Sequence, residues 1–260
     1  MDLNETLVKV YRQHWTNLQS VLRETDNVER NFTYPLLINI FPEYLISPVK
    51  LFVVGQQTRG WQKKTEGDAI TYLMQRYEHF HLGQRYRRTP FWQACHQLNL
   101  KLNPDGPQYG FIWSNLIKID QNKHRPVAEI EEKVCTAFPV LPLEIQISRP
   151  DVVIFFTGPN YDFRLKKTFY GLTFQAIAGY KVRTLARVIH NSLPYNSFRI
   201  YHPAYLAWIS RLRNEQILAN LCQGFYPLLF PKWLELDRSP PRADYRLFCT
   251  EHTPQRTGQI

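Results

Sequence analysis

Side chains that could recognise a nucleic acid base lie at the ends of four apolar stretches of this chain. The stretches are 51–54, 111–116, 152–156 and 198–201, and the side chains at their ends are Gln56, Gln57, Thr58, Arg59, Asn115, Asn160, Tyr161 and His202. Amides match the hydrogen-bonding edges of bases, and aromatic rings stack on base faces. Carboxylates that could act as general bases are scarce in this set. The residue types therefore favour recognition of a planar heterocycle.

Each of these residues also has an ordinary structural explanation when it is taken alone. Asparagine at a strand end often caps a turn, which would account for Asn115. His202 precedes Pro203 and could belong to a surface loop, and the sequence Gly-Gln-Gln at 55–57 is by itself only a turn. The placement of all of them at strand ends is the feature that indicates a site.

Strands and helices alternate along the chain, which predicts a three-layer α/β/α fold with a mostly parallel, four-stranded central sheet. Strands are expected at 51–54, 111–116, 152–156, 182–188 and 198–201, and helices at 2–24, 68–81, 89–98, 163–177 and 204–221, with a further helix that begins at Pro126. Apolar runs of this kind suit strands that are buried on both faces. In open α/β sheets ligands bind beyond the carboxyl ends of the strands, where the polar side chains lie.

A single domain over 1–236 fits the length, with the amphipathic helix 2–24 packed on it and 237–260 as a loosely ordered extension. No run of about 18 apolar residues occurs. The N-terminal residues also lack the basic and apolar segments of a signal peptide. We therefore expect a cytoplasmic chain that does not enter a membrane.

The balance of charge points to a polyanionic partner. The chain has 32 Lys and Arg against 22 Asp and Glu, a net charge of +10. Basic side chains that neutralise phosphates release condensed counterions, so DNA is the expected partner. The four cysteines are far apart and neither they nor the histidines have the spacing of a metal site, so no metal or other cofactor is expected.

Four motifs, in chain order, resemble those of the uracil-DNA glycosylase superfamily. Family-1 members run from the first strand into Gly-Gln-Asp-Pro-Tyr-His, where this chain has Gly-Gln-Gln-Thr-Arg at 55–59. Their second strand ends Gly-Val-Leu-Leu-Leu-Asn, and 110–115 reads Gly-Phe-Ile-Trp-Ser-Asn. Their third reads Val-Val-Phe-Leu-Leu-Trp-Gly, similar to 152–158, and their His-Pro-Ser-Pro-Leu is similar to 202–206. The likeness spans roughly 50–210.

This resemblance implies a four-stranded parallel sheet and an enzyme that hydrolyses the N-glycosidic bond of a base flipped out of DNA. Asn115 would read the base and His202 would stabilise the charge on the leaving base. Leu206 would fill the vacated stack. The expected contacts to the substrate come from Gln56, Thr58, Arg59, Asn160, Tyr161 and Tyr205. The enzyme is expected to act as a monomer and without a lyase step.

Two departures from the family-1 pattern bear on chemistry and substrate. Gln57 replaces the water-activating aspartate, and a glutamine orients water but cannot take its proton. Arg59 replaces the tyrosine that excludes 5-substituted pyrimidines. Two substrates follow from this replacement. The first is a bulky 5-modified cytosine of phage DNA, which would give the enzyme a role in phage defence. The second is plain uracil, in which case Arg59 would contact a DNA phosphate. Asp120 is interpreted as a solvated loop charge.

Two other classes of function compete with a glycosylase. The loss of the aspartate at Gln57 suggests a catalytically inactive DNA-binding protein on the same scaffold. Asp151, after Pro150, begins one nuclease signature, but the second acidic residue followed one position later by lysine is missing. The nearest candidate is Asp162, followed by Phe163 and Arg164. A nuclease is therefore the weakest of the three interpretations.

Overall fold

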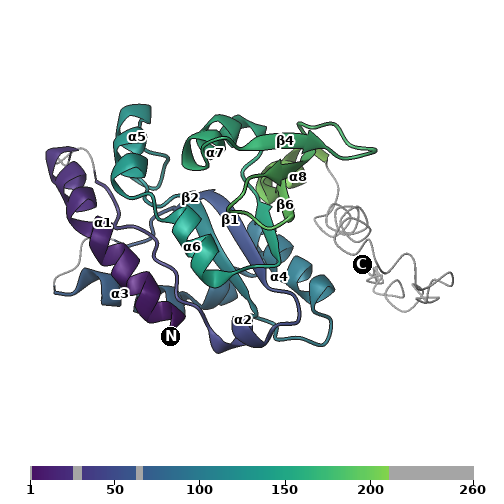
Figure 1. Cartoon of the computed structure of the whole chain (residues 1–260), viewed down its shortest axis with the longest axis horizontal. Coiled ribbons are helices and arrows are strands. Elements are labelled where there is room, and N and C mark those ends of the chain that lie inside the picture. The colour runs from purple at the N-terminus through teal and green to yellow at the C-terminus, as the bar shows by residue number, and fades with distance from the viewer. Residues whose placement is uncertain (1, 26–30, 63–66, 211–260) are drawn as a thin grey trace, which may run out of the picture.

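The computed structural model describes residues 2–25, 31–62 and 67–210 of the chain (Figure 1). The strands are β1 (Leu51–Gln57), β2 (Phe111–Ile117), β3 (Val152–Phe155), β4 (Thr173–Ala176), β5 (Leu185–Ile189) and β6 (Asn196–Ile200). The helices are α1 (Leu3–Thr25), α2 (Pro42–Ile46), α3 (Ala69–Phe80), η1 (His81–Tyr86), α4 (Pro90–Leu102), α5 (Ala128–Ala137), α6 (Leu141–Ser148), η2 (Pro159–Tyr161), α7 (Asp162–Thr168) and α8 (Pro203–Ser210).

The expectation of a mixed α/β fold is confirmed, but the sheet is larger than predicted. It has six strands rather than four, in the order β2-β1-β3-β6-β5-β4. The four neighbours β2, β1, β3 and β6 are parallel, whereas β5 and β4 add antiparallel pairs beyond β6. The parallel strands are almost wholly buried, as the continuous apolar runs at the start of β1, β2 and β3 predicted.

The prediction of one helix over 163–177 is wrong. Helix α7 ends at Thr168, Gly171 then adopts a positive φ of 83°, and β4 follows. The positive φ is a conformation that glycine adopts at little cost, and it turns the chain away from the helix. Because β4 is an edge strand with three of its four residues exposed, it lacks the apolar run that marks the buried strands.

Smaller differences concern element boundaries. Residues 182–184 precede β5, which begins at Leu185, and Val127 lies just before α5 rather than inside it. The expected helix over 204–221 is described as α8 up to Ser210, and its remainder lies outside the described residues. The extension at 237–260 also lies outside them.

Helices cover both faces of the parallel sheet. The chain passes from β1 to β2 through α3, η1 and α4, and returns past β1 to β3 through α5 and α6. These two crossovers run in opposite directions along the sheet, so right-handed connections place their helices on opposite faces. Figure 1 shows α6 on the near side of the sheet and α4 on the far side.

Helix α1 packs against this body through the stripe of apolar residues seen in the sequence. Leu7, Tyr11, Leu18 and Leu22 are buried. The Tyr11 hydroxyl donates to Glu144 Oε1 at 2.8 Å, and the other oxygen of that carboxylate lies 2.5 Å from Lys118 Nζ. This fully enclosed group of charges ties α1 and α6 to the chain that leaves β2.

The free edge of β2 is covered by α3. The Tyr77 hydroxyl donates to the Trp113 carbonyl and accepts from the Trp113 N–H, each at 2.9 Å. These bonds satisfy backbone groups that an edge strand leaves open. Within the described ranges, no helix is long and apolar enough to cross a membrane.

Candidate active site

The carboxyl ends of the parallel strands bring the predicted residues of the first three motifs together. Strand order reverses between β1 and β3, since the chain leaves β1 for β2 on one side and later returns to β3 on the other. Such a reversal opens the crevice in which ligands of α/β sheets bind. Gly55 of β1 is paired with Asn115 of β2, so the first two motifs are direct neighbours. The Phe156 N–H donates to the Val54 carbonyl at 2.8 Å, so the residues that follow β3 lie beside the end of β1.

Asn115 presents a hydrogen-bond donor that has no partner. The residue is 2% exposed, and its Oδ1 accepts from the indole N–H of Trp113 at 3.2 Å. Its Nδ2 is buried without a hydrogen bond. Leaving a buried polar group unpaired costs about 1–3 kcal/mol, so a bound acceptor at this atom would recover that free energy. Asn115 lies inside β2, and the turn-capping explanation is wrong.

Gly55 makes room for this amide. A Cβ atom on Gly55 would lie 2.4 Å from Asn115 Oδ1 and 3.4 Å from Phe91 Cζ. Any larger residue at this position would push the amide or the ring away. The amide of Asn115 and the edge of the Phe91 ring therefore share the space above the backbone of β1.

Two buried hydroxyl groups without partners lie in the same region. Thr58 follows β1 and is 2% exposed, and Thr157 follows β3 and is 1% exposed; neither Oγ1 has a hydrogen bond. The Thr157 carbonyl accepts from Gln56 Nε2 at 2.9 Å, which joins the ends of the two strands. Thr157 was not among the predicted site residues, although the sequence places it directly after an apolar run.

Gln57 is held in one orientation by Tyr161. The Tyr161 hydroxyl donates to Gln57 Oε1 at 2.8 Å, so the NH₂ group of this amide is the part left to face a ligand. Arg164 stacks on the Tyr161 ring at 5.2 Å and also pairs with Glu131. Burial raises the pKa of Tyr161, which keeps the phenol protonated as a donor. Glu131, Arg164 and Tyr161 thus form a chain of contacts that ends at Gln57.

His202 lies against an aromatic ring supplied by α4. The Phe91 ring is stacked on the His202 imidazole, with centroids 5.3 Å apart and planes 14° apart. His202 Nδ1 accepts from the Ala204 N–H at 3.2 Å, which places the proton of the neutral ring on Nε2. Burial lowers the pKa of His202 to about 4, so the ring is a neutral N–H donor near pH 7. Phe91 was missed, because it belongs to a helix without any motif.

Asp120 is not the solvated loop charge that the sequence suggested. It is fully buried, and its carboxylate accepts from the N–H groups of Gly60 at 2.8 Å and Lys123 at 2.9 Å. The Thr33 hydroxyl donates to it at 3.2 Å. The loop after β1 is therefore fixed to the turn after β2, and Asp120 has a structural role in placing Thr58 and Arg59.

The remaining predicted residues lie at the outside of the site. Arg59 and Asn160 are exposed, Tyr205 is 43% exposed and Leu206 is half-buried. The Tyr205 ring packs on Tyr201 with a centroid distance of 4.9 Å. These positions suit contacts with a large ligand that extends beyond the strand ends.

The carboxylates of the nuclease interpretation are used in structural contacts. Asp151 accepts from the Lys50 N–H at 2.8 Å, and Asp162 pairs with the buried Arg199 at 2.9 Å. Across the described ranges, no group of three or more His, Cys, Asp or Glu side chains could hold a metal ion. The two cysteines described there are free, and burial raises the pKa of both thiols.

Comparisons with known proteins add no relatives to this description. A scan against protein-family models found no match, and a search of curated proteins found no matching sequence either.

Proposed function

We propose that this chain is a monofunctional DNA glycosylase, which flips a pyrimidine nucleotide out of DNA and hydrolyses its N-glycosidic bond. The observation that carries the proposal is the unpaired, buried Nδ2 of Asn115 at the carboxyl ends of the parallel strands, where the neutral imidazole of His202 also lies. A pyrimidine has carbonyl oxygens that accept hydrogen bonds from both kinds of donor. The motif resemblance of the sequence supports the same activity.

Each group has a defined part in the reaction. The bond between C1′ and the base breaks, and its electron pair leaves with the base. His202 Nε2–H donates to the oxygen on which this negative charge develops, and a neutral donor fixed in advance stabilises that charge. Water then adds to C1′, and its proton goes to the departing base, since Gln57 cannot accept it. The NH₂ group of Gln57 orients the water.

Entry of the base requires a local movement. Asn115 Nδ2 is buried, and the Phe91 ring lies beside Gly55 and is stacked on His202. A shift of the Phe91 ring would make the Asn115 amide accessible to the base. The ring would also offer an aromatic face on which the flipped base stacks. Leu206 at the outside would fill the space that the base leaves, and the basic surface would hold the phosphates.

Two substrates remain in the proposal, and both depend on Arg59. Its exposed guanidinium could donate to a polar 5-substituent of a modified phage cytosine, or could bind a phosphate while the base is uracil. Excision of modified cytosine would place the enzyme in phage defence.

One observation favours the second candidate, an inactive DNA-binding protein. The carbonyl oxygen of Gln57 is engaged by Tyr161, so this residue offers a donor where a water-activating group needs an acceptor. The inactive protein would bind DNA and form no abasic sites, and His202→Ala would change nothing in such an assay.

The test is release of bases from defined DNA. Oligonucleotides that carry uracil or 5-modified cytosines are incubated with the chain, and alkali then cleaves any abasic site. We expect cleavage with one of these bases, and a loss of about 10²-fold or more in His202→Ala, the range seen when a transition-state donor is removed. The exposed His124→Ala is the matched control. No cleavage with any base would support the inactive protein.

A further inference from the structure

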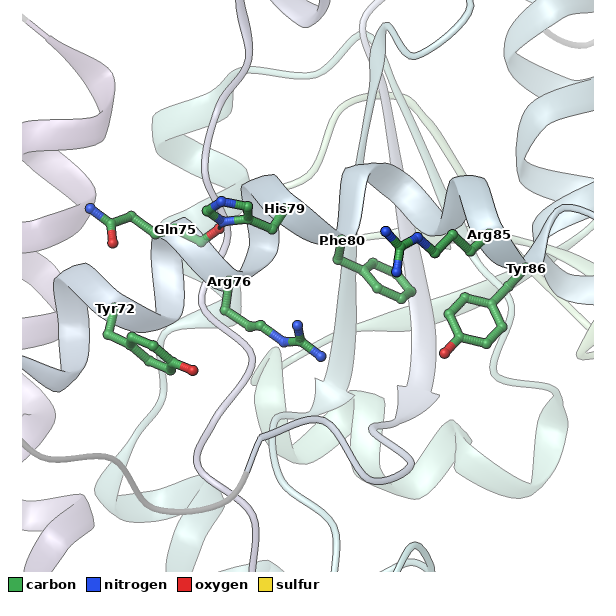
Figure 2. A pocket seen from close by; sticks show the side chains of 7 residues that line it. All are labelled: Tyr72, Gln75, Arg76, His79, Phe80, Arg85 and Tyr86. Atoms are coloured by element: carbon green, nitrogen blue, oxygen red, sulfur yellow. Dashed lines mark hydrogen bonds between the residues drawn. The ribbon is translucent and has the colours of Figure 1, made fainter.

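A groove of about 450 Å³ lies on α3 and η1, outside the crevice at the strand ends. Most of its walls are basic and aromatic side chains, and we call it the α3–η1 groove. It is lined by Tyr72, Gln75, Arg76, His79, Phe80, Arg85 and Tyr86. Figure 2 shows Tyr72 and Tyr86 at opposite ends of the groove, with Arg76 between them and Arg85 beside Phe80. None of these residues belongs to the four motifs at the strand ends.

Within the part of the chain that the structure describes, no carboxylate pairs with the positive charge of the groove. The segment 69–88 contains four arginines and one glutamate. Neither Arg76 nor Arg85 forms an ion pair with a carboxylate of the described residues. Guanidinium groups that are free in this way bind phosphates by paired hydrogen bonds.

The aromatic rings of the groove differ in exposure. Tyr72 is 40% exposed and Tyr86 is 54% exposed, so both offer faces to a ligand. Phe80 forms the floor and is fixed by edge contacts with Trp61 at 5.2 Å and Trp92 at 5.3 Å. Open tyrosine faces beside arginines are the combination on which the bases of a single strand stack while its phosphates are bound.

The groove is connected to the proposed active site through two contacts. The Phe80 ring packs on Trp113 at 5.4 Å, and the indole N–H of Trp113 donates to Asn115 Oδ1 at 3.2 Å. Through the buried Trp113, the floor of the groove therefore touches the side chain that holds Asn115 in place.

We infer that the α3–η1 groove binds single-stranded DNA next to the target nucleotide, with one phosphate on each of Arg76 and Arg85 and unstacked bases on Tyr72 and Tyr86. The inference rests on the proposed function for its choice of DNA. Stacking on the tyrosines requires bases that are not held inside a duplex. The groove thus makes an unpaired segment the preferred substrate.

Binding is measured on the full chain by fluorescence anisotropy, with labelled oligothymidylate and a duplex of equal length, over a range of salt concentrations. Tyr72→Ala with Tyr86→Ala is expected to weaken oligothymidylate binding at least fivefold for each ring. A variant in which both tyrosines are changed to Phe keeps the two rings and should retain binding. Arg76→Gln with Arg85→Gln should reduce the slope of log K against log salt by about 1.4, or 0.7 for each phosphate contact.

Matched controls lie on other surfaces. Tyr170 is 94% exposed on the segment between α7 and β4, and Tyr170→Ala should leave binding unchanged. The double variant Arg23→Gln and Arg149→Gln removes two exposed arginines on other surfaces. It should lose less affinity for oligothymidylate than the double variant in the groove. Equal losses in the controls and the groove variants would overturn the inference.

The outcomes separate this inference from the proposed function. Groove variants that bind oligothymidylate normally would overturn the inference, even if His202→Ala stops base release. Groove variants that lose as much affinity for the duplex as for the single strand would also overturn it. A chain that releases no base, but whose groove variants lose single-strand binding, would refute the glycosylase and support the groove.

Discussion

Acid should destabilise the folded protein through His202. Burial lowers the pKa of this residue from its ordinary value of 6.5 to about 4. Between these two values the unfolded chain binds a proton that the folded chain does not. Protonation therefore favours unfolding, and the free energy of unfolding rises as the pH increases from 4 to 6.5.

The size of the effect follows from the two pKa values. A tenfold change in proton affinity corresponds to 1.36 kcal/mol, so acidification from pH 7 to pH 4 should cost about 3 kcal/mol through His202 alone. This is a large part of the stability of an ordinary domain, about 5–15 kcal/mol. The same shift keeps the ring neutral throughout the range in which it would act as a donor.

The measurement is urea unfolding of the wild type and of His202→Gln at pH 7 and pH 4. His96, whose pKa burial also lowers to about 4, is present in both proteins, so its contribution cancels in the comparison. The wild type should lose about 3 kcal/mol more than the variant on acidification. Equal losses would show that His202 is not buried in its neutral form and would refute the reasoning.

Two further substitutions test the packing around the site. Gly55→Ala puts a Cβ atom 2.4 Å from Asn115 Oδ1 and should cost about 1–3 kcal/mol in urea unfolding; a cost that does not shrink in an Asn115→Ala background would contradict this. Glu144→Gln leaves the charge of Lys118 buried without its partner and should cost about 3–5 kcal/mol. The exposed Glu132→Gln should cost less than about 1 kcal/mol, and equal costs would refute the buried pair.

The parallel strands could be predicted because they are buried on both faces. Such burial demands continuous apolar residues, and the runs that begin at Leu51, Phe111 and Val152 have that composition. Strand β4 is an exposed edge strand without that requirement, so its sequence did not distinguish it from the end of a helix. Strand β4 therefore escaped prediction, whereas β5 overlaps the strand expected at 182–188.

The site shows a similar division. Asn115 could be singled out from its place on a strand, and its proximity to Gly55 follows from the pairing of β1 with β2. The hydrogen bond between Tyr161 and Gln57 joins residues 104 positions apart, and a local sequence pattern cannot predict a contact of this range. Asp120 was misjudged for the same reason, since the amides that surround it come from a distant loop.

The most direct test of the central claim is abasic-site formation by the wild type, Asn115→Ala and His202→Ala on DNA that carries uracil or 5-modified cytosines. The account predicts that the wild type releases one of these bases, and that both variants still bind DNA but lose release by about 10²-fold or more. DNA binding without any abasic sites in the wild type, or full activity in both variants, would contradict it.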